Sequence, residues 1–366
     1  MSGTIREPAR RGIVLAALVL LIGCGGSPGS NPGGASGTSA SADETPGAWR
    51  VVGVPSGGTA LNDIACVSAA DCWAVGGAVE GTAGVEIEHD VNGTWTLAGG
   101  GETGQLNGIA CLANGVCWAV GEGPYGPLIE TLAGGAWRTV AAPDAGTPYW
   151  LDDIACPAPG DCWAVGGGPE ALVEHYSGGV WAVVHSPSLV SGTAEVVALG
   201  GIACPGQDDC WAVGGTAIEH YTGTAWALVT TPTGDSGGSL ESVACASISD
   251  CWAVGSTSAP FQPLFNRYAG GAWTLASGPA VRGNSFLQGV TCLTTGDCWA
   301  VGSRSGNSQP LIETNGDGAW TVVDSPTLSG QRSAGQLQNV VCVASADCWA
   351  LGDSNDGVLV ETDAAS

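Results

Sequence analysis

The stretch IACVSAADCWAVG, residues 64–76, decides the fold, because the chain repeats it. Six related strings follow at spacings of 41 to 50 residues, beginning at Ile109, Ile154, Ile202, Val243, Val290 and Val340. Each copy holds two short runs rich in Val, Ile, Cys and Trp on either side of a polar turn. Such runs indicate β-strands, and no sustained 3.6-residue period occurs after the first 24 residues. The sequence therefore predicts an all-β protein made of repeated units.

One unit contains four expected strands. In the first unit, residues 61–66 and 72–76 form the first two strands. The third is a short apolar run that ends in Glu, as at residues 172–174, and the fourth begins at a Trp after a Gly-rich turn, as at Trp137. A unit of about 40 to 50 residues with four strands has the length of one blade of a β-propeller.

The tryptophans predict the number of blades and how they close. Of the 15 Trp residues, seven follow a Cys in a second strand, seven begin a fourth strand, and Trp150 is the remainder. The last unit ends near Thr362 without a fourth strand, whereas an unassigned fourth strand, residues 49–52, precedes the first unit. Pairing of these two segments would leave no open edge on an incomplete blade. We therefore predict a seven-bladed β-propeller over residues 49–366, closed by its N-terminal strand.

Fourteen of the 15 Cys residues form seven pairs, one in each unit. The pairs are Cys66 and Cys72, Cys111 and Cys117, Cys156 and Cys162, Cys204 and Cys210, Cys245 and Cys251, Cys292 and Cys298, and Cys342 and Cys348. In an exported chain this spacing predicts a disulfide between the first two strands of each blade. The alternative is metal binding, but a zinc site needs four ligands from one place, and each pair belongs to a different blade. We expect disulfides, no metal and no cofactor.

The N-terminus has the features of an export signal. Several Arg residues precede an apolar segment, residues 13–22, which is too short to span a membrane. The closing Leu-Ile-Gly-Cys, residues 21–24, resembles the lipobox of bacterial lipoprotein signal peptides. The resemblance implies cleavage after residue 23 and attachment of lipid to Cys24. An ordinary secretory signal that contains a Cys by chance is the alternative.

The segment after Cys24 predicts a tether. Residues 25–46 consist mainly of Gly, Ser, Ala, Pro and Thr, and such a segment cannot bury enough apolar surface to fold. We therefore expect a signal peptide at residues 1–23 and a lipidated, flexible tether at residues 24–48. The protein is then held by lipid in a bacterial cell envelope, outside the cytoplasm.

The turns before the fourth strands resemble the Asp-boxes of BNR-repeat propellers, whose pattern is S-x-D-x-G-x-x-W. Residues 90–95 (DVNGTW) and 315–320 (NGDGAW) come closest, each one residue short. The Trp-Ala-Val-Gly second strand followed by such a turn is similar to the propeller family of photosystem II assembly factors. The resemblance covers residues 49–362 and implies the propeller fold. It implies no particular function, because propellers serve as binding proteins and as enzymes alike.

The chain is strongly acidic, with 34 Asp and Glu residues against 9 Arg and no Lys, a net charge of −25 and a pI near 4.1. This balance argues against nucleic acid as a partner, because no cationic surface could displace the counterions of its phosphates. Direct binding to anionic lipid is disfavoured for the same reason. We expect a protein or glycan ligand, membrane contact through lipid only, and a monomer.

Polar residues that recur from unit to unit predict structural roles. One position of the third strand is Asn266 in the fifth unit and Glu in the others, namely Glu88, Glu130, Glu174, Glu219, Glu313 and Glu361. One carboxylate per blade cannot form the pair that glycoside hydrolysis needs. His89, His175 and His220 follow three of these Glu residues and cannot share a metal either. The Asp before the second Cys is expected to stabilise a turn.

Loops between blades are irregular, and function concentrates in such loops on a rigid scaffold. Arg282, Arg304 and Arg332 lie in consecutive loops around the sixth blade and could hold an anion, unless they pair with surface acids. Tyr149 and Trp150 could bind a sugar or a protein, or fill the channel mouth. Other loop aromatics are Tyr125, Phe261 and Phe286. These residues predict a ligand site on the loop face, opposite the disulfide hairpins.

We therefore expect a binding or assembly module for a protein or glycan of the cell envelope. The alternative is a glycoside hydrolase or lyase with its site at the channel mouth. Sialidases of the Asp-box class use three Arg residues, which Arg282, Arg304 and Arg332 match by type, but the early Arg-Ile-Pro motif of that class is absent. No nucleophile elbow, phosphate loop or metal-binding His pair occurs, so we predict no catalytic residue. A purely structural surface protein is a third possibility.

Overall fold

The computed structural model describes most of the chain after residue 47. The described residues are 48–54, 60–78, 84–100, 103–145, 148–187, 198–232, 237–304, 309–316, 318–326, 334–355 and 357–364. Every described strand belongs to the unit Pro46–Ser366. Among the described residues there is no helix with the length and hydropathy of a membrane span. The predicted signal, Cys24 and nearly all of the tether lie outside the described residues.

The described strands form antiparallel meanders of four, in which strands that follow one another along the chain are neighbours. In chain order the strands are β1 (Arg50–Val52), β2 (Leu61–Ser68), β3 (Asp71–Ala78), β4 (Val85–Val91), β5 (Thr94–Gly100), β6 (Gly104–Cys111), β7 (Cys117–Gly123), β8 (Gly126–Ala133), β9 (Ala136–Val140), β10 (Trp150–Ala158), β11 (Asp161–Gly167), β12 (Leu172–Ser177), β13 (Val180–Val184), β14 (Gly201–Gly206), β15 (Asp209–Gly214), β16 (Ala217–Tyr221), β17 (Trp226–Val229), β18 (Gly238–Ser247), β19 (Asp250–Thr257), β20 (Pro263–Ala269), β21 (Ala272–Ala276), β22 (Ser285–Cys292), β23 (Cys298–Arg304), β24 (Gln309–Thr314), β25 (Thr321–Val323), β26 (Gly335–Ala344), β27 (Asp347–Ser354) and β28 (Gly357–Thr362).

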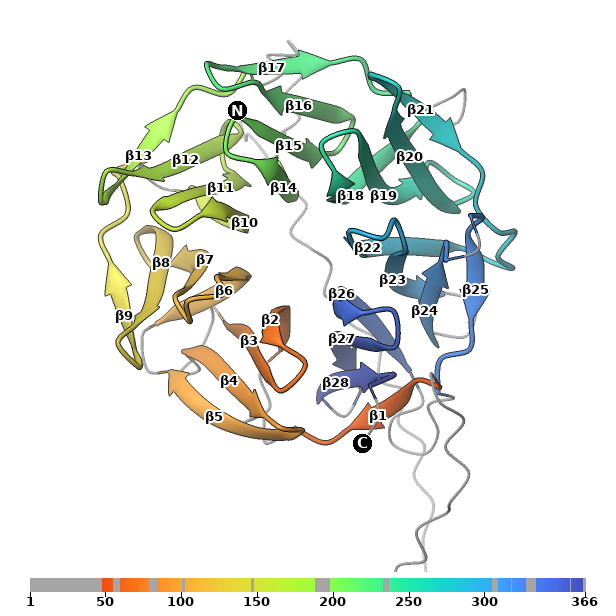
Figure 1. Ribbon diagram of the computed structural model, residues 1–366, viewed down its shortest axis with the longest axis horizontal. Helices are drawn as coiled ribbons and strands as arrows, with labels where there is room; N and C mark the ends of the chain where they lie inside the picture. Colours follow the sequence, from red (N-terminus) through yellow and green to blue (C-terminus); the bar gives the residue numbers. More distant parts are fainter. Residues whose placement is uncertain are drawn as a thin grey trace, which may run out of the picture. The chain divides into compact units, whose positions relative to one another are not determined.

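We name each four-stranded group by its first strand. The β10, β14, β18 and β22 groups are separate sheets, and β26–β28 form another sheet with β1. The β2 and β6 groups are joined into one eight-stranded sheet where Gly77 and Ala78 pair with Gln105 and Gly104. Figure 1 shows the groups arranged around a central axis, with the first strand of each innermost and the fourth outermost. The predicted all-β class is confirmed.

The two ends of this unit pair with each other. In β1 and β28, Arg50 lies opposite Thr362 and Val52 opposite Val360, so the N-terminal strand completes the sheet of the last group (Figure 1). Trp349 and Val360 of that group also pack in one apolar cluster with Leu61 of the β2 group. The last group therefore contacts both the start of the described chain and the β2 group.

The two sets of tryptophans pair across the boundaries between groups. In each pair, a second-strand Trp meets the Trp at the start of the fourth strand of the next group, with ring centroids 5.3–5.8 Å apart and planes inclined by 64–84°. The pairs are Trp73–Trp137, Trp118–Trp181, Trp163–Trp226, Trp211–Trp273, Trp252–Trp320, Trp299–Trp49 and Trp349–Trp95. Edge-to-face pairs add about 0.5–1.5 kcal/mol beyond the area that they bury. The tryptophans therefore bind neighbouring groups to each other.

Each group contains one disulfide between its first and second strands, so the predicted pairing is confirmed. The paired Cα atoms lie 3.9–4.1 Å apart. In the β2 group, Cys66 lies directly opposite Cys72 in the hairpin. Closing such short loops contributes at most about 2–3 kcal/mol each.

A β-bulge in the first strand positions a polar connection between groups. In β2 the register shifts between Leu61 and Asp63. The Asp63 carboxylate accepts hydrogen bonds from the backbone N–H groups of Ile64 and Ile109, both at 2.7 Å, and from the Asn339 side chain. Asp63 therefore links the β26, β2 and β6 groups. The Gly of Trp-Ala-Val-Gly faces the same bulge: a Cβ on Gly76 would lie 1.9 Å from a carbonyl oxygen.

Candidate functional site

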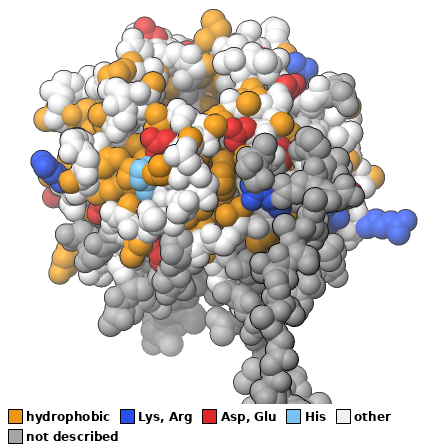
Figure 2. All heavy atoms as spheres, turned by 60° about the horizontal axis from the view of Figure 1, so that its bottom comes forward, with side chains coloured by type: hydrophobic (Ala, Val, Ile, Leu, Met, Phe, Trp, Pro, Cys, Tyr) orange, Lys and Arg blue, Asp and Glu red, His pale blue; other side chains and the backbone are white. Residues whose placement is uncertain are grey.

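Two of the three predicted loop arginines can be placed. Arg282 is exposed in the loop before β22, and Arg304 ends β23, opposite Ser285. The two therefore lie at the same end of one hairpin. Arg304 is partly buried, its Nε atom has no hydrogen-bond partner among the described residues, and its charge acts on Glu313. Arg332 lies outside the described residues. On the face shown in Figure 2, basic side chains are few and scattered.

Tyr149 and Trp150 pack against the β10 group. The Trp150 indole N–H donates to Asp152 (2.9 Å), and Trp150 lies opposite Gly167. Tyr149 is partly buried against an apolar cluster that includes Leu151 and Leu172, and a Cβ on Gly168 would lie 2.4 Å from its ring. Figure 1 places the β10 group and the β22 group on opposite sides of the central axis. The structure therefore does not bring this aromatic pair together with the arginines.

A more exposed aromatic site lies beside Arg282. Phe261, which is 36% exposed, stacks obliquely on Phe286 with ring centroids 5.0 Å apart. The Gln262 side chain donates to the carbonyl oxygen of Gly283 (2.6 Å), next to Arg282, so the loop before β20 is tied to the loop before β22. We call Phe261, Gln262, Arg282 and Phe286 the Phe261 patch. Sequence reasoning noted both Phe residues as loop aromatics but had no signal that their two loops meet.

The repeated Glu residues are buried, one in each group that has them. Burial raises the pKa of Glu174 to about 8, and that of Glu88 to about 7, where the neighbouring Glu86 carboxyl adds to the effect. The pKa of Glu313 also rises to about 8, because burial outweighs the opposing charge of Arg304. At pH 7 the Glu174 and Glu313 carboxyl groups are therefore mostly neutral. The two residues belong to β12 and β24 of different groups and therefore do not form the close carboxyl pair that glycoside hydrolysis needs.

Serines from the preceding group reach two of these carboxylates. The Ser186 hydroxyl donates to Glu219 (2.8 Å), and the Ser325 hydroxyl donates to Glu361 (3.0 Å). Both serines stand directly before a Pro in the loop after a fourth strand. In the loop after β9, which precedes the group of Glu174, the residue before Pro is Ala142 instead of Ser. The Glu174 oxygens accordingly have no hydrogen-bond partner among the described residues. The structural role predicted for these positions thus includes contacts between groups.

Several Asp residues before the second Cys contact a side chain of the third strand instead of making only the turn contact expected for them. Asp71 is hydrogen-bonded to His89 across the sheet, with Oδ1 and Nε2 2.8 Å apart, and the His89 ring stacks on Trp73 at 3.7 Å. Asp161 with His175, and Asp209 with His220, repeat the arrangement at 2.7 Å. These His residues are thus satisfied by one Asp and one Trp each. Among the described residues, no cluster of three His, Cys, Asp or Glu side chains could hold a metal.

Comparison with known proteins identifies the fold. No protein-family model matches the chain, and no curated protein matches it. Among solved structures, YCF48 bound to D1 peptide superimposes with a TM-score of 0.61 at 15% identity, covering 88% of this chain and 97% of that one. At this identity the likeness shows the β-propeller fold and no more.

Propellers of other functions are similar to the same extent. The virginiamycin B lyase from Staphylococcus aureus with quinupristin matches with a TM-score of 0.58 at 12% identity, covering 86% of this chain and 98% of the lyase. The GH74 xyloglucanase from Xanthomonas campestris matches with a TM-score of 0.58 at 12% identity, covering 85% of this chain and 53% of the enzyme. The predicted propeller fold is confirmed, and the choice among functions must come from this chain's own residues.

Proposed function

We propose that this protein is a lipid-anchored β-propeller of the bacterial cell envelope that binds a protein or glycan through the Phe261 patch. The lipobox-like residues 21–24 support the anchor at Cys24, and the polar residues 25–46 support a tether. The disulfides in every group support an oxidising location outside the cytoplasm.

The scaffold of this module is, in our proposal, a closed ring of seven blades. The pairing of β1 with β28 supports closure, as does the contact between Trp349 and Trp95. The hydrogen bond from Asn339 to Asp63 joins the same two groups near the axis. A closed ring completes every blade, leaves only the short outer edges of the blades unpaired and holds its loops in fixed positions.

The observation that supports binding most directly is the Phe261 patch. Interfaces are enriched in aromatic residues and Arg, which supply large contact areas. Phe261 is exposed although Phe is usually buried, and Gln262 holds it in place beside Arg282. A ring of this kind can pack on a protein side chain or on the apolar face of a sugar. The repeated Glu residues lie one per group, so no pair of them supports the hydrolase alternative.

Phe261→Ala is expected to weaken binding to the physiological partner at least tenfold, because the substitution removes the exposed ring. Partners are sought among envelope proteins and on a glycan array, using the mature chain with Cys24→Ser, and the affinity is then measured by calorimetry. Tyr125→Ala is the matched control, because Tyr125 is a loop aromatic that is 88% exposed in another group. Equal loss in the two variants, or no partner in either screen, would argue against the proposed site.

Cys24→Ser is expected to release the protein from the membrane, because the thiol that receives the lipid is lost. The measurement is incorporation of a palmitate analogue, together with the distribution of the protein between membrane and soluble fractions. Wild-type protein should be labelled and membrane-bound, and the variant unlabelled and soluble. An unlabelled wild type would show that the segment is an ordinary secretory signal.

A further inference from the structure

Four groups share, on the hairpin side, an arrangement that holds a His or Arg side chain. A cationic or imidazole side chain from the third strand lies on the second-strand Trp and contacts the Asp before the second Cys. His89, His175 and His220 provide it in three groups, with ring centroids 3.7–3.8 Å from the Trp centroid. We call the pair formed by the second-strand Trp ring and the Asp before the second Cys the receptor of its group, because in different groups it holds different side chains.

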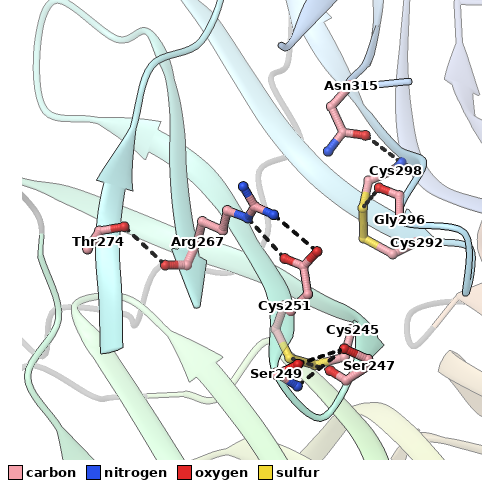
Figure 3. Close-up of polar contacts among 11 residues, drawn as sticks. Cys245, Ser247, Ser249, Cys251, Arg267, Thr274, Cys292, Gly296, Cys298 and Asn315 are labelled. Atoms are coloured by element: carbon pink, nitrogen blue, oxygen red, sulfur yellow. Dashed lines mark hydrogen bonds and ion pairs between the residues drawn. A yellow bond between two sulfur atoms is a disulfide. The ribbon is translucent and has the colours of Figure 1, made fainter. Parts of the chain in front are cut away.

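Arg267 shows how this receptor accepts a guanidinium. Its Nε and Nη2 atoms donate to the two oxygens of Asp250, at 3.0 and 3.2 Å, and its guanidinium carbon lies 5.2 Å from the Trp252 ring centroid. Figure 3 shows the Arg267 side chain extending from the third strand to a carboxylate beside the Cys245–Cys251 disulfide. A forked contact with a carboxylate and a cation–π contact are both favourable for Arg.

In the β22 group the receptor is present but its occupant is missing. Thr314 stands where Arg267 stands in the β18 group, and its hydroxyl donates to the carbonyl oxygen of Cys298 (3.1 Å). Trp299 is only partly buried, whereas the other six second-strand Trp residues are 2–8% exposed. A hollow of about 270 Å³ opens there, and we call it the Trp299 hollow. Its lining residues are Asp297, Trp299, Thr314, Gly316, Thr321 and Ser345.

The two other groups with Thr at this position do not share these features. In the β6 group, Val116 replaces the Asp, and Tyr176 of the next group packs on Trp118 with ring centroids 4.6 Å apart. In the β26 group, Trp349 is 3% exposed. Of the three groups with Thr at this position, the β22 group alone, within the described residues, combines a partly exposed second-strand Trp with the Asp before the second Cys.

We propose that the Trp299 hollow binds the guanidinium of an arginine side chain from a partner protein. Thr295 and Ser345 both donate to Oδ2 of Asp297, at 3.1 Å, which fixes the carboxylate and leaves Oδ1 for the guanidinium. The Trp299 ring can offer a guanidinium the same kind of aromatic face that the Trp252 ring offers to Arg267 in the neighbouring group. The net charge of −25 favours the approach of a basic partner.

This site does not depend on the proposed function of the Phe261 patch. Asp297 lies in the hairpin turn after the C-terminal end of β22, whereas Phe286 lies near the start of that strand. The two sites therefore occupy opposite ends of the β22 group and can be tested separately.

The test is titration of the mature Cys24→Ser chain with acetyl-Gly-Arg-Gly-amide, followed by NMR of the tryptophan indole N–H groups. The Trp299 signal, assigned with Trp299→Phe, should shift and saturate. The citrulline peptide, which has the same shape without the charge, should leave it unchanged. Equal shifts with citrulline, or equal affinity for the lysine peptide, would overturn the assignment of a guanidinium site.

Variants of the chain test the geometry. Asp297→Asn should weaken binding at least fivefold, and Thr314→Arg should abolish it by filling the hollow from within. Asp250→Asn is the matched control, because Arg267 already occupies that receptor, and it should leave the affinity within twofold. Arg267→Thr should create a second site, detected at the Trp252 indole. Absence of that second site, in a variant with the wild-type melting temperature, would contradict the proposal.

Discussion

Asp63→Ala is expected to lower the free energy of unfolding by about 4 kcal/mol. The Asp63 carboxylate is 4% exposed and accepts the backbone N–H groups of Ile64 and Ile109 as well as the Asn339 amide. Removing it leaves these buried donors without this acceptor, and each unsatisfied buried donor costs about 1–3 kcal/mol. Urea denaturation with the disulfides intact, followed by tryptophan fluorescence, measures the change.

Asp153→Ala is the matched control for this prediction. Asp153 accepts the N–H groups of Ile154 and Ile202, at 2.7 and 2.8 Å, in the same bulge geometry. These hydrogen bonds of Asp153 join the β10 group to the β14 group, whereas those of Asp63 join the β2 group both to the β6 group and to the last group, β26. Asp63→Ala should therefore be the more destabilising of the two. Equal or smaller loss at Asp63 would contradict a special role for this residue in holding the ends together.

The double variant Glu174→Gln, Glu313→Gln is expected to be more stable than the wild type at pH 8 by several kcal/mol, and similar to it at pH 4. In the unfolded chain both carboxyl groups ionise near pH 4.5, whereas in the folded protein burial raises both pKa values to about 8. Between these values the folded state keeps protons that the unfolded state has lost. Wild-type stability therefore falls as pH rises from about 4.5 to 8, by up to about 1.4 kcal/mol per pH unit for each carboxyl.

Melting temperatures between pH 4 and pH 8 measure this slope. Glu219→Gln is the control, because the Ser186 hydroxyl bonds the Glu219 carboxylate and opposes the rise of its pKa. The stability gained at pH 8 by Glu219→Gln should be smaller than that gained by Glu174→Gln or by Glu313→Gln alone. Ala142→Ser should also stabilise the protein at pH 8, by giving Glu174 the serine that Glu219 has. A wild-type slope that survives in the double variant would rule out these two carboxyl groups as its source.

Much of the fold could be predicted because the recurring Cys and Trp residues mark where each repeated unit begins and ends. The Cys spacing predicted a hairpin and its disulfide within one unit, where the partners are close in sequence. The two sets of Trp residues could also be recognised in the sequence. A repeated sequence does not indicate, however, whether a residue contacts its own unit or a neighbouring one. The pairing of Trp73 with Trp137, in the following group, depends on how two units pack and has no local sequence signal.

Roles that depend on contacts between strands were harder to predict. An Asp before a Cys favours a turn as much as a partner across the sheet, so the contact between Asp71 and His89 could not be chosen from the sequence. The loop residues lack a repeat altogether, and the meeting of Phe261 with Phe286 follows from loop conformations that composition does not specify. The Trp299 hollow is visible in the sequence only as Thr314, which becomes informative once the role of Arg267 is known.

The N-terminal strand is expected to complete the last blade and so to close a ring of seven. A crystal structure of the mature chain with Cys24→Ser measures this directly. The expected result is a ring of seven four-stranded blades in which residues 50–52 lie hydrogen-bonded alongside residues 360–362. A different number of blades, or an N-terminal segment that leaves β28 as an open edge, would contradict a closed ring of seven.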